Sequence, residues 1–444
     1  MKNVIYRFYV LLLIGLFVVS PAARAQTVQN QATGDLPNPF QVYEKGLLEN
    51  DYLTPLIELR RNEAEYLKSK QWSGLIPDLL AYLNSFVGEY ETAYPFLDRH
   101  FEKQIGLQPD LQKSPLDDYV PRDAFETIAS AADKHQVIMI NEEHDTPMHR
   151  AFTARLLPVL YKKGFRYLAA ETLFETDTNL NSRGYPTHKT GFYANDPVFG
   201  EMLRTALKLG FKLVPYEHNP KERCVSPQDK PNFCQDERER GQAQNLYDNV
   251  FKSDPQAKVL VHVGRGHNQK RKYDDWALMG WHFQQISRTE PFSVNQMMSE
   301  RSAPRYERPE YRYVTNKWKF NEPIVFQSKS GEWWKSNGYD LVVYHPRSVY
   351  RNGRPTWLEI NGMRRETKID WKKLKLSVQN KRLVGSEPIL VQVFVQREST
   401  DAVPVDQIIL YPNKEIPVLM LPKGDFRIRA MDKSGKEIGG YKVS

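Results

Sequence analysis

The feature that most constrains the fold is an alternation of short apolar runs and amphipathic segments between residues 122 and 290. The apolar runs with strand character are 136–140, 167–170, 212–215 and 258–263. The segments between them, which have the apolar spacing of helices, are 149–163, 197–210 and 237–251. Strands that alternate with helices favour a mainly parallel sheet with flanking helices. The sequence therefore predicts an α/β domain, which we place at residues 121–370.

The first 25 residues have the three parts of a cleavable signal peptide. Lys2 and Arg7 supply positive charge, residues 10–19 form a short apolar core, and Ala23-Arg24-Ala25 is a small-x-small cleavage site. An uncleaved membrane anchor is the alternative, but the core is shorter than the roughly 20 residues that a spanning helix needs. No later stretch is apolar enough to span a membrane. We therefore expect a periplasmic or secreted protein.

Three further segments complete the predicted organisation. Residues 26–38 are polar and contain Gly and Pro, as in a flexible leader. Residues 39–120 have helical apolar spacing, notably at 75–83 and 87–101, and are expected to form a helical cap. Residues 371–444 are expected to form a small antiparallel β-sandwich. Its predicted strands are 389–396, 407–411, 416–421 and 425–430, and 341–344 is a further strand of the main sheet.

Charge and cysteine content exclude some classes of function. The formal net charge of the whole chain is +8, but basic and acidic residues are interleaved, so nucleic acid is not an expected partner. The chain has two cysteines, Cys224 and Cys234. In an oxidising compartment this pair could form a disulfide that closes the loop between them; two free thiols are the alternative. Two cysteines are too few for a Cys-rich zinc site.

Ionisable residues collect where the predicted strands end. The candidate catalytic residues are Glu142, His144, Glu171, Glu217 and His267. The carboxyl ends of parallel strands share one edge of the sheet, which is where α/β proteins bind their ligands. Taken singly, a carboxylate here could simply cap the next helix, and a loop histidine could simply be solvated. Glu143 and His218 are assigned to such structural roles, because neighbours in a strand point to opposite faces.

Carboxylates and imidazoles gathered in this way suit two kinds of chemistry. They can bind a divalent metal such as Zn²⁺ or Mn²⁺, with His144 and His267 as candidate ligands. They can also work without metal, as a general base and its orienting partner. His149, Arg238 and Asn268 are secondary candidates for ligand binding. The glycines of Gly264-Arg265-Gly266 are expected to let the backbone bend so that His267 turns into the site.

These motifs resemble those of the superfamily that includes erythromycin esterase-like enzymes, ChaN haem-uptake lipoproteins and TIKI/TraB proteases. The resemblance rests on residues 141–144, Glu171, Glu217 and 264–267, and covers roughly residues 122–350. The usual first motif is Gly-Glu-x-His, and Asn141 stands where its Gly is expected. Residues 144–149 look most like the ChaN branch, whereas 238–245 look more like the esterase-like branch.

The branches imply different activities. The esterase-like branch implies hydrolysis with His144 as general base, and the TIKI-like branch implies a metal-dependent peptidase. The ChaN-like branch implies haem or iron binding without catalysis, for which Tyr193, Tyr216 and His149 are possible axial ligands.

The sequence therefore predicts an exported hydrolase that cleaves an ester or peptide bond in a small-molecule or peptide substrate. A binding protein for haem, iron or another small ligand is the main alternative, and a structural envelope protein with a degenerate site is the third. The substrate, the cofactor, the oligomeric state and the role of the C-terminal domain stay open.

Overall fold

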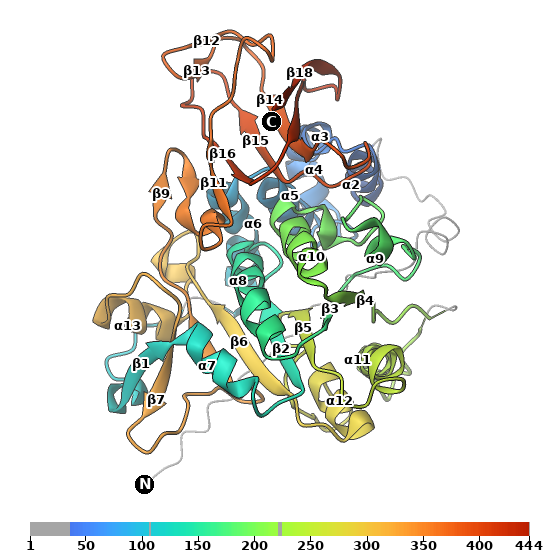
Figure 1. The fold of residues 1–444 in the computed structure, drawn as a ribbon, viewed down its shortest axis with the longest axis vertical. Helices are drawn as coiled ribbons and strands as arrows, with labels where there is room; N and C mark the ends of the chain where they lie inside the picture. Colours follow the sequence, from blue (N-terminus) through green and yellow to red (C-terminus); the bar gives the residue numbers. More distant parts are fainter. Residues whose placement is uncertain (1–35, 106–107, 221–223, 444) are drawn as a thin grey trace.

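The computed structural model describes residues 36–105, 108–220 and 224–443 (Figure 1). The predicted signal peptide, 1–25, and most of the predicted leader lie outside these ranges. Among the described residues, no helix is both long and apolar enough to cross a membrane.

A large, mostly parallel sheet forms the centre of the molecule, as the sequence predicts. Its eight strands lie in the order β1-β7-β8-β6-β2-β5-β3-β4. The strands are β1 (Tyr119–Asp123), β2 (Val137–Glu142), β3 (Tyr167–Ala170), β4 (Lys212–Val214), β5 (Val259–Gly264), β6 (Phe292–Met298), β7 (Ile324–Ser328) and β8 (Leu341–Tyr344). The strands from β8 to β4 are parallel, and only the edge pairings that involve β7 are antiparallel.

Helices cover both faces of this sheet. They are α7 (Ala124–Ala131), α8 (Met148–Lys162), α9 (Leu180–Arg183), α10 (Pro197–Leu209), α11 (Phe233–Leu246), α12 (Met279–Ser287) and α13 (Pro309–Lys317). Along β2, Ile138 and Ile140 belong to the core that α8 and α10 share, whereas Val137 and Met139 belong to the core of α11 and α12. Strands buried on both faces explain the nearly continuous apolar runs in the sequence.

The helix after residue 196 shows how local sequence sets the element boundaries. The Asp196 side chain accepts hydrogen bonds from the backbone N–H groups of Val198 and Phe199, and Pro197 occupies the first helical position. Gly210 ends α10 in the left-handed conformation, with φ +96°. The helix predicted at 237–251 is α11 followed by a π-helical turn, η3 (Tyr247–Phe251).

Helices precede the sheet, and small antiparallel sheets follow it. The helices of the predicted cap are α2 (Pro39–Leu48), α3 (Leu53–Arg61), α4 (Glu63–Lys68), α5 (Ile76–Phe86) and α6 (Tyr90–Ile105). The C-terminal four-stranded sheet contains β14 (Ile389–Val395), β15 (Asp406–Leu410), β17 (Phe426–Met431) and β18 (Glu437–Val443). Strand β11 (Arg364–Thr367) pairs with β16 (Leu419–Pro422). The shortest pairs are β9 (Tyr350–Arg351) with β10 (Arg354–Pro355) and β12 (Val378–Gln379) with β13 (Arg382–Leu383).

The termini of the described chain pack against each other. In Figure 1 the blue helices of the cap lie beside the red C-terminal sheet. The Gln407 side chain donates to the carbonyl of Phe86, and the Gln392 side chain donates to the carbonyl of Asn50. Strand β1 spans the boundary predicted at 120/121, and β11 pairs across the one predicted at 370/371. These contacts do not fix where one domain ends and the next begins, so the domain boundaries stay predictions.

Candidate functional site

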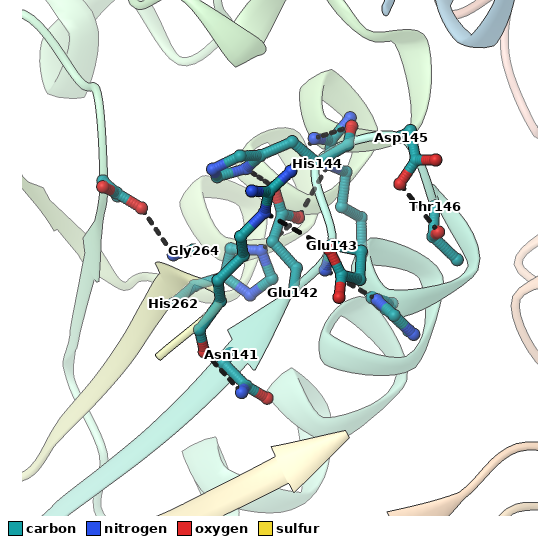
Figure 2. A network of polar contacts seen from close by, with 12 residues as sticks. Asn141, Glu142, Glu143, His144, Asp145, Thr146, His262 and Gly264 are labelled. Carbon is teal, nitrogen blue, oxygen red and sulfur yellow. Dashed lines mark hydrogen bonds and ion pairs between the residues drawn. The ribbon is translucent and has the colours of Figure 1, made fainter. Parts of the chain in front are cut away.

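Glu142, the last residue of β2, lies at the centre of a buried polar cluster (Figure 2). Its Oε1 lies 2.9 Å from Nδ1 of His144 and accepts a hydrogen bond of 2.8 Å from Nη2 of Arg150. Its Oε2 accepts a 2.8 Å hydrogen bond from Nε of Arg150 and lies 2.8 Å from Nε2 of His262. Both oxygens of this buried carboxylate therefore have strong partners.

These partners keep Glu142 charged. Burial by itself favours the neutral acid, but the charges of Arg150 and His262 and the hydrogen bonds hold the pKa of Glu142 well below its usual value. An ionised carboxylate only accepts hydrogen bonds, so Nδ1 of His144 carries the proton in this pair. When the ring is neutral, Nε2 of His144 is then left with a free lone pair.

Helix α8 supplies the positive charge. Arg150 lies in its first turn and is completed by Asp196, whose Oδ2 accepts a 2.8 Å hydrogen bond from Nη1. The same carboxylate caps α10, so the ends of two helices meet at the cluster. Thr153 lies one turn further along α8, and its Oγ1 is 3.1 Å from Nδ1 of His262.

His144 lies against the end of the neighbouring strand, β5. Glu142 and Gly264 are partners in the parallel register of β2 and β5. A Cβ atom on Gly264 would overlap the His144 ring and come within 2.7 Å of Oε2 of Glu171. Glycine is thus needed here for space. The backbone bend that was expected at the two glycines lies instead at Arg265, which has a positive φ of +40°.

A second cluster brings together two carboxylates, that of Glu171 after β3 and that of Glu217 after β4. Nη2 of Arg238, on α11, lies 3.0 Å from Oε1 of Glu171 and 3.2 Å from Oε2 of Glu217. Oε2 of Glu171 also accepts a 2.5 Å hydrogen bond from the backbone N–H of Gly264. Burial opposes its ionisation, but the charges of His267 and Arg238 lower the pKa of Glu171 to about 2.

His267 joins this second cluster through two glutamates. Its Nδ1 lies 2.6 Å from Oε1 of Glu239, and its Nε2 lies 3.8 Å from Oε1 of Glu171. Burial disfavours the imidazolium, but the negative charges of Glu239 and Glu171 outweigh it and raise the pKa of His267. Glu239 is held in turn by the backbone N–H of Met279.

The predicted candidates thus fall into two clusters that meet at Gly264. Glu142 and His144 form one, and the other contains Glu171, Glu217, His267 and Arg238. A Cβ atom on Gly264 would meet both the His144 ring and Oε2 of Glu171, so the two clusters lie side by side. The side chain of His144 is 12% exposed and that of Arg238 is 22% exposed, so both reach the surface of the site.

Two secondary candidates lie deeper in the protein. Nδ1 of His149 accepts a hydrogen bond from the backbone N–H of Glu143, and the ring faces His345 at 5.1 Å between centroids. Burial and the nearby His345 hold the pKa of His149 well below its usual value. Asn268 is fully buried and donates to the carbonyls of Met139 and Val294, which ties the loop after β5 to β2 and β6.

Residues outside the predicted set have central positions. His262 lies inside β5, two residues before Gly264, and contacts Glu142 directly. A histidine within the apolar run 258–263 is the signal that could have identified it. Glu239 directly follows Arg238 on α11, and its burial and its contacts with His267 and the backbone N–H of Met279 distinguish it from a solvated helix residue.

Asn141 and Glu143 have structural contacts. Nδ2 of Asn141 donates to the carbonyl of Arg265 at 2.5 Å, and its Oδ1 accepts from the backbone N–H of Gln296. The residue that departs from the usual motif therefore links β2 to β6 and to the loop after β5. Oε2 of Glu143 lies 3.3 Å from Nε of Arg265, so Glu143 faces a cation of the loop after β5.

The donor set does not fit a metal centre. Within residues 36–105, 108–220 and 224–443, no group of three or more His, Cys, Asp or Glu side chains is arranged to hold a metal ion. The Arg238 guanidinium already occupies the space between the carboxylates of Glu171 and Glu217. His144 and His267 each present Nδ1 to a separate glutamate instead of sharing one centre.

The possible haem ligands are enclosed by protein. Tyr216 is fully buried, and its hydroxyl lies 3.4 Å from the carbonyl of His262. His149 is also fully buried. Tyr193 is 5% exposed and stacks on His144. The burial of all three side chains leaves none of them open to a ligand of the size of haem, so the residues present do not fit haem.

Cys224 and Cys234 form the predicted disulfide, with Cα atoms 5.7 Å apart. Cys234 is the second residue of α11, the helix that carries Arg238, Glu239 and Gln242. Gln242 donates to Oε1 of Glu217 at 2.8 Å. The covalent link therefore fixes the first turn of a helix that contributes to the second cluster.

The chain matches no protein-family model and no curated protein. Among solved structures it is similar to the type III effector HopBA1, with 13% identity and a TM-score of 0.33 over 52% of this chain and 99% of that one. It is also similar to ChaN of Campylobacter jejuni, described with cofacial haem binding, with 14% identity and a TM-score of 0.31 over 53% of this chain and 99% of that one. A third is RRSP, a MARTX toxin effector domain from Vibrio vulnificus CMCP6, with 16% identity and a TM-score of 0.26 over 54% of this chain and 45% of that one. TM-scores this low support no argument about the function of this chain.

Proposed function

We propose that this chain is an exported hydrolase in which His144 is the general base that activates water for cleavage of an ester or peptide bond. The observation that carries the proposal is the 2.9 Å contact between Nδ1 of His144 and the buried, charged carboxylate of Glu142. This contact fixes the tautomer that a general base needs.

In the proposed reaction, Nε2 of His144 takes a proton from a water molecule as its oxygen bonds to the substrate carbonyl carbon. The carbonyl π electrons move to oxygen and give a tetrahedral oxyanion. When the oxyanion collapses, the bond to the leaving alcohol or amine breaks, and the imidazolium of His144 returns its proton to the leaving group. Glu142 stays ionised and stabilises the transient imidazolium.

The second cluster would stabilise the oxyanion. Glu239 and Glu171 raise the pKa of His267, which favours its protonated form, and Nη1 of Arg238 lies 3.5 Å from its Nε2. Positive groups that are already in place contribute most when negative charge develops in a site with little water. Glu171 and Glu217 would hold Arg238 in position.

Export and fold assignment belong to the same proposal. The signal-type sequence of residues 1–25 and the disulfide between Cys224 and Cys234 support a periplasmic or secreted location. The motif pattern supports membership of the erythromycin esterase/ChaN/TIKI superfamily. Leu419 and Leu421 of β16 share a core with Val391 and Ile428, which supports a β-sandwich at the C-terminus.

Haem binding is the weaker alternative, because Tyr193, Tyr216 and His149 are enclosed by protein. An absorption spectrum of the protein with added haem tests it directly. A stoichiometric Soret band that persists in the His144→Ala variant would favour the binding protein over the hydrolase.

The direct test is a screen of the purified protein against ester and peptide libraries, followed by His144→Ala and His267→Ala. We expect both variants to lose at least about a hundredfold in kcat/KM while remaining folded. His135→Ala is the matched control, since this histidine precedes the opposite end of β2. Full activity in both site variants, or no hydrolysis of any substrate by the wild type, would overturn the proposal.

A further inference from the structure

The imidazole of His144 is packed by aromatic rings that come from distant parts of the chain. Its ring stacks on Tyr193 with centroids 4.0 Å apart and an interplanar angle of 17°. Tyr82 meets the same ring edge-on at 6.3 Å and meets Tyr193 edge-on at 5.5 Å. Both tyrosines are buried, so their rings are walls of the site and not free surfaces for a ligand.

These aromatic residues connect the base to the helical cap. Tyr82 lies on α5, and Tyr193 begins the short 3-10 helix η2 (Tyr193–Asn195). Phe192 packs against Tyr193 at 5.0 Å and against Tyr43 of α2 at 5.5 Å. The rings therefore form a continuous contact from the cap to His144.

The position of Tyr193 is fixed at the end of β3. The backbone N–H of Phe192 donates to the carbonyl of Thr172, the residue after Glu171, and Gly191 pairs with Leu173. A Cβ on Gly191 would come 2.5 Å from the Thr172 carbonyl oxygen, so this approach requires glycine. The segment that carries Tyr193 is thus attached directly to a strand end of the site.

We propose that Tyr193 and Tyr82 are positioning residues for His144, so that α5 of the helical cap is part of the active site. This inference rests on the proposed function for its catalytic consequence. Glu142 fixes one nitrogen of the ring, but one hydrogen bond leaves the imidazole free to rotate about it. Stacking on Tyr193 removes that freedom and keeps Nε2 beside Gly264.

The experiment compares Tyr193→Leu with Tyr193→Phe, which keeps the aromatic face and removes only the hydroxyl. With a substrate from the screen, we expect Tyr193→Leu to lower kcat about five- to tenfold with KM within about twofold, and Tyr193→Phe to match the wild type. Tyr161→Leu is the control for loss of a packed tyrosine, because Tyr161 packs against Phe211 at the far end of α8.

Histidine NMR supplies a readout that does not depend on activity. The ring current of Tyr193 should shift the Cε1–H resonance of His144 upfield in the wild type and in Tyr193→Phe, and this shift should disappear in Tyr193→Leu. If the wild type hydrolyses nothing, the proposed function fails while the NMR result still decides the stacking. An unchanged resonance together with wild-type kcat in Tyr193→Leu would overturn the inference. If that variant does not fold, Tyr82→Leu against Tyr82→Phe decides by the same two readouts.

Discussion

At the scale of single residues, the buried charge of Glu142 is the feature on which the rest of the site depends. It contacts His144, His262 and Arg150 at once, and Arg150 is shared with Asp196. A buried charge that loses its partner is costly, whereas an exposed ion pair contributes little. Changes at Glu142 should therefore affect both stability and activity.

We expect Glu142→Gln to lower the free energy of unfolding by about 3 kcal/mol, because Arg150 loses one of its two buried charged partners and keeps only Asp196. The same change should lower kcat by at least about a hundredfold, since the amide no longer stabilises the His144 imidazolium. Chemical denaturation and steady-state kinetics measure these effects. The control is Glu322→Gln, an exposed partner of Arg155, with an expected change within about 0.5 kcal/mol. Equal effects of the two variants would contradict this account of Glu142.

The raised pKa of His267 predicts a direction of pH dependence. A group whose pKa is higher in the folded state binds its proton more tightly there, so it stabilises the fold fully below its unfolded pKa of about 6.5. This contribution is lost as the pH rises through the folded value. The difference in unfolding free energy between wild type and His267→Gln should therefore shrink from pH 6 towards alkaline pH. A difference that grows with pH would show that His267 is not held as a cation.

At the scale of elements, α11 carries much of the second cluster, and its first turn is held by the disulfide. Closing a loop of this length stabilises a fold by about 3 kcal/mol in the chain-entropy model. We expect the double variant Cys224→Ser, Cys234→Ser to lose up to that amount and to lose activity, because Arg238 follows Cys234 by one helical turn. A reducing agent should reproduce both effects in the wild type and change nothing in the double variant. Full activity after complete reduction would show that α11 keeps its position without the link.

Strands β2, β3, β4, β5 and β8 of the main sheet could be predicted because they are continuous apolar runs, whereas β1, β6 and β7 were not predicted, and β6 shows a physical reason. Its sequence contains Ser293, Asn295 and Gln296, which look unfavourable for a buried strand. In the fold their polar groups are paired: Ser293 donates to the carbonyl of Asn268, and Gln296 donates to the carbonyl of Asn141. Hydropathy does not reveal such pairing, since the partners lie far apart in sequence.

The same limit applies to the site. The strand-end rule selects Glu142, His144, Glu171, Glu217 and His267 as candidates from the sequence, because it needs only the position of each residue after a strand. The roles of His262 and Glu239 depend on side-chain partners from other elements, Glu142 and His267. Spacing along one segment carries no information about those pairs.

At the scale of the whole molecule, the cap, the sheet and the C-terminal strands share one hydrophobic core. Asp406, at the start of β15, is buried and lies 2.7 Å from Nη2 of Arg354; its other oxygen accepts from the backbone N–H of Met420. The next residue, Gln407, donates to the carbonyl of Phe86 at the end of α5. The C-terminal sheet is therefore joined through buried polar groups to the same cap helix that contacts His144.

We expect Asp406→Ala to lower the free energy of unfolding by about 3–5 kcal/mol, because Arg354 and Arg364 would keep buried charges without their carboxylate. Since the core is continuous, the loss should appear at one denaturant midpoint, both in circular dichroism, which reports the helices of the cap and of the main sheet, and in tryptophan fluorescence, to which Trp371 beside the core of the C-terminal strands contributes. Glu387→Ala removes an exposed pair with Lys433 and should leave that midpoint unchanged. Two separate midpoints in Asp406→Ala would instead show that the C-terminal sheet unfolds independently. The position of Tyr82 beside His144 would then not depend on the C-terminal sheet.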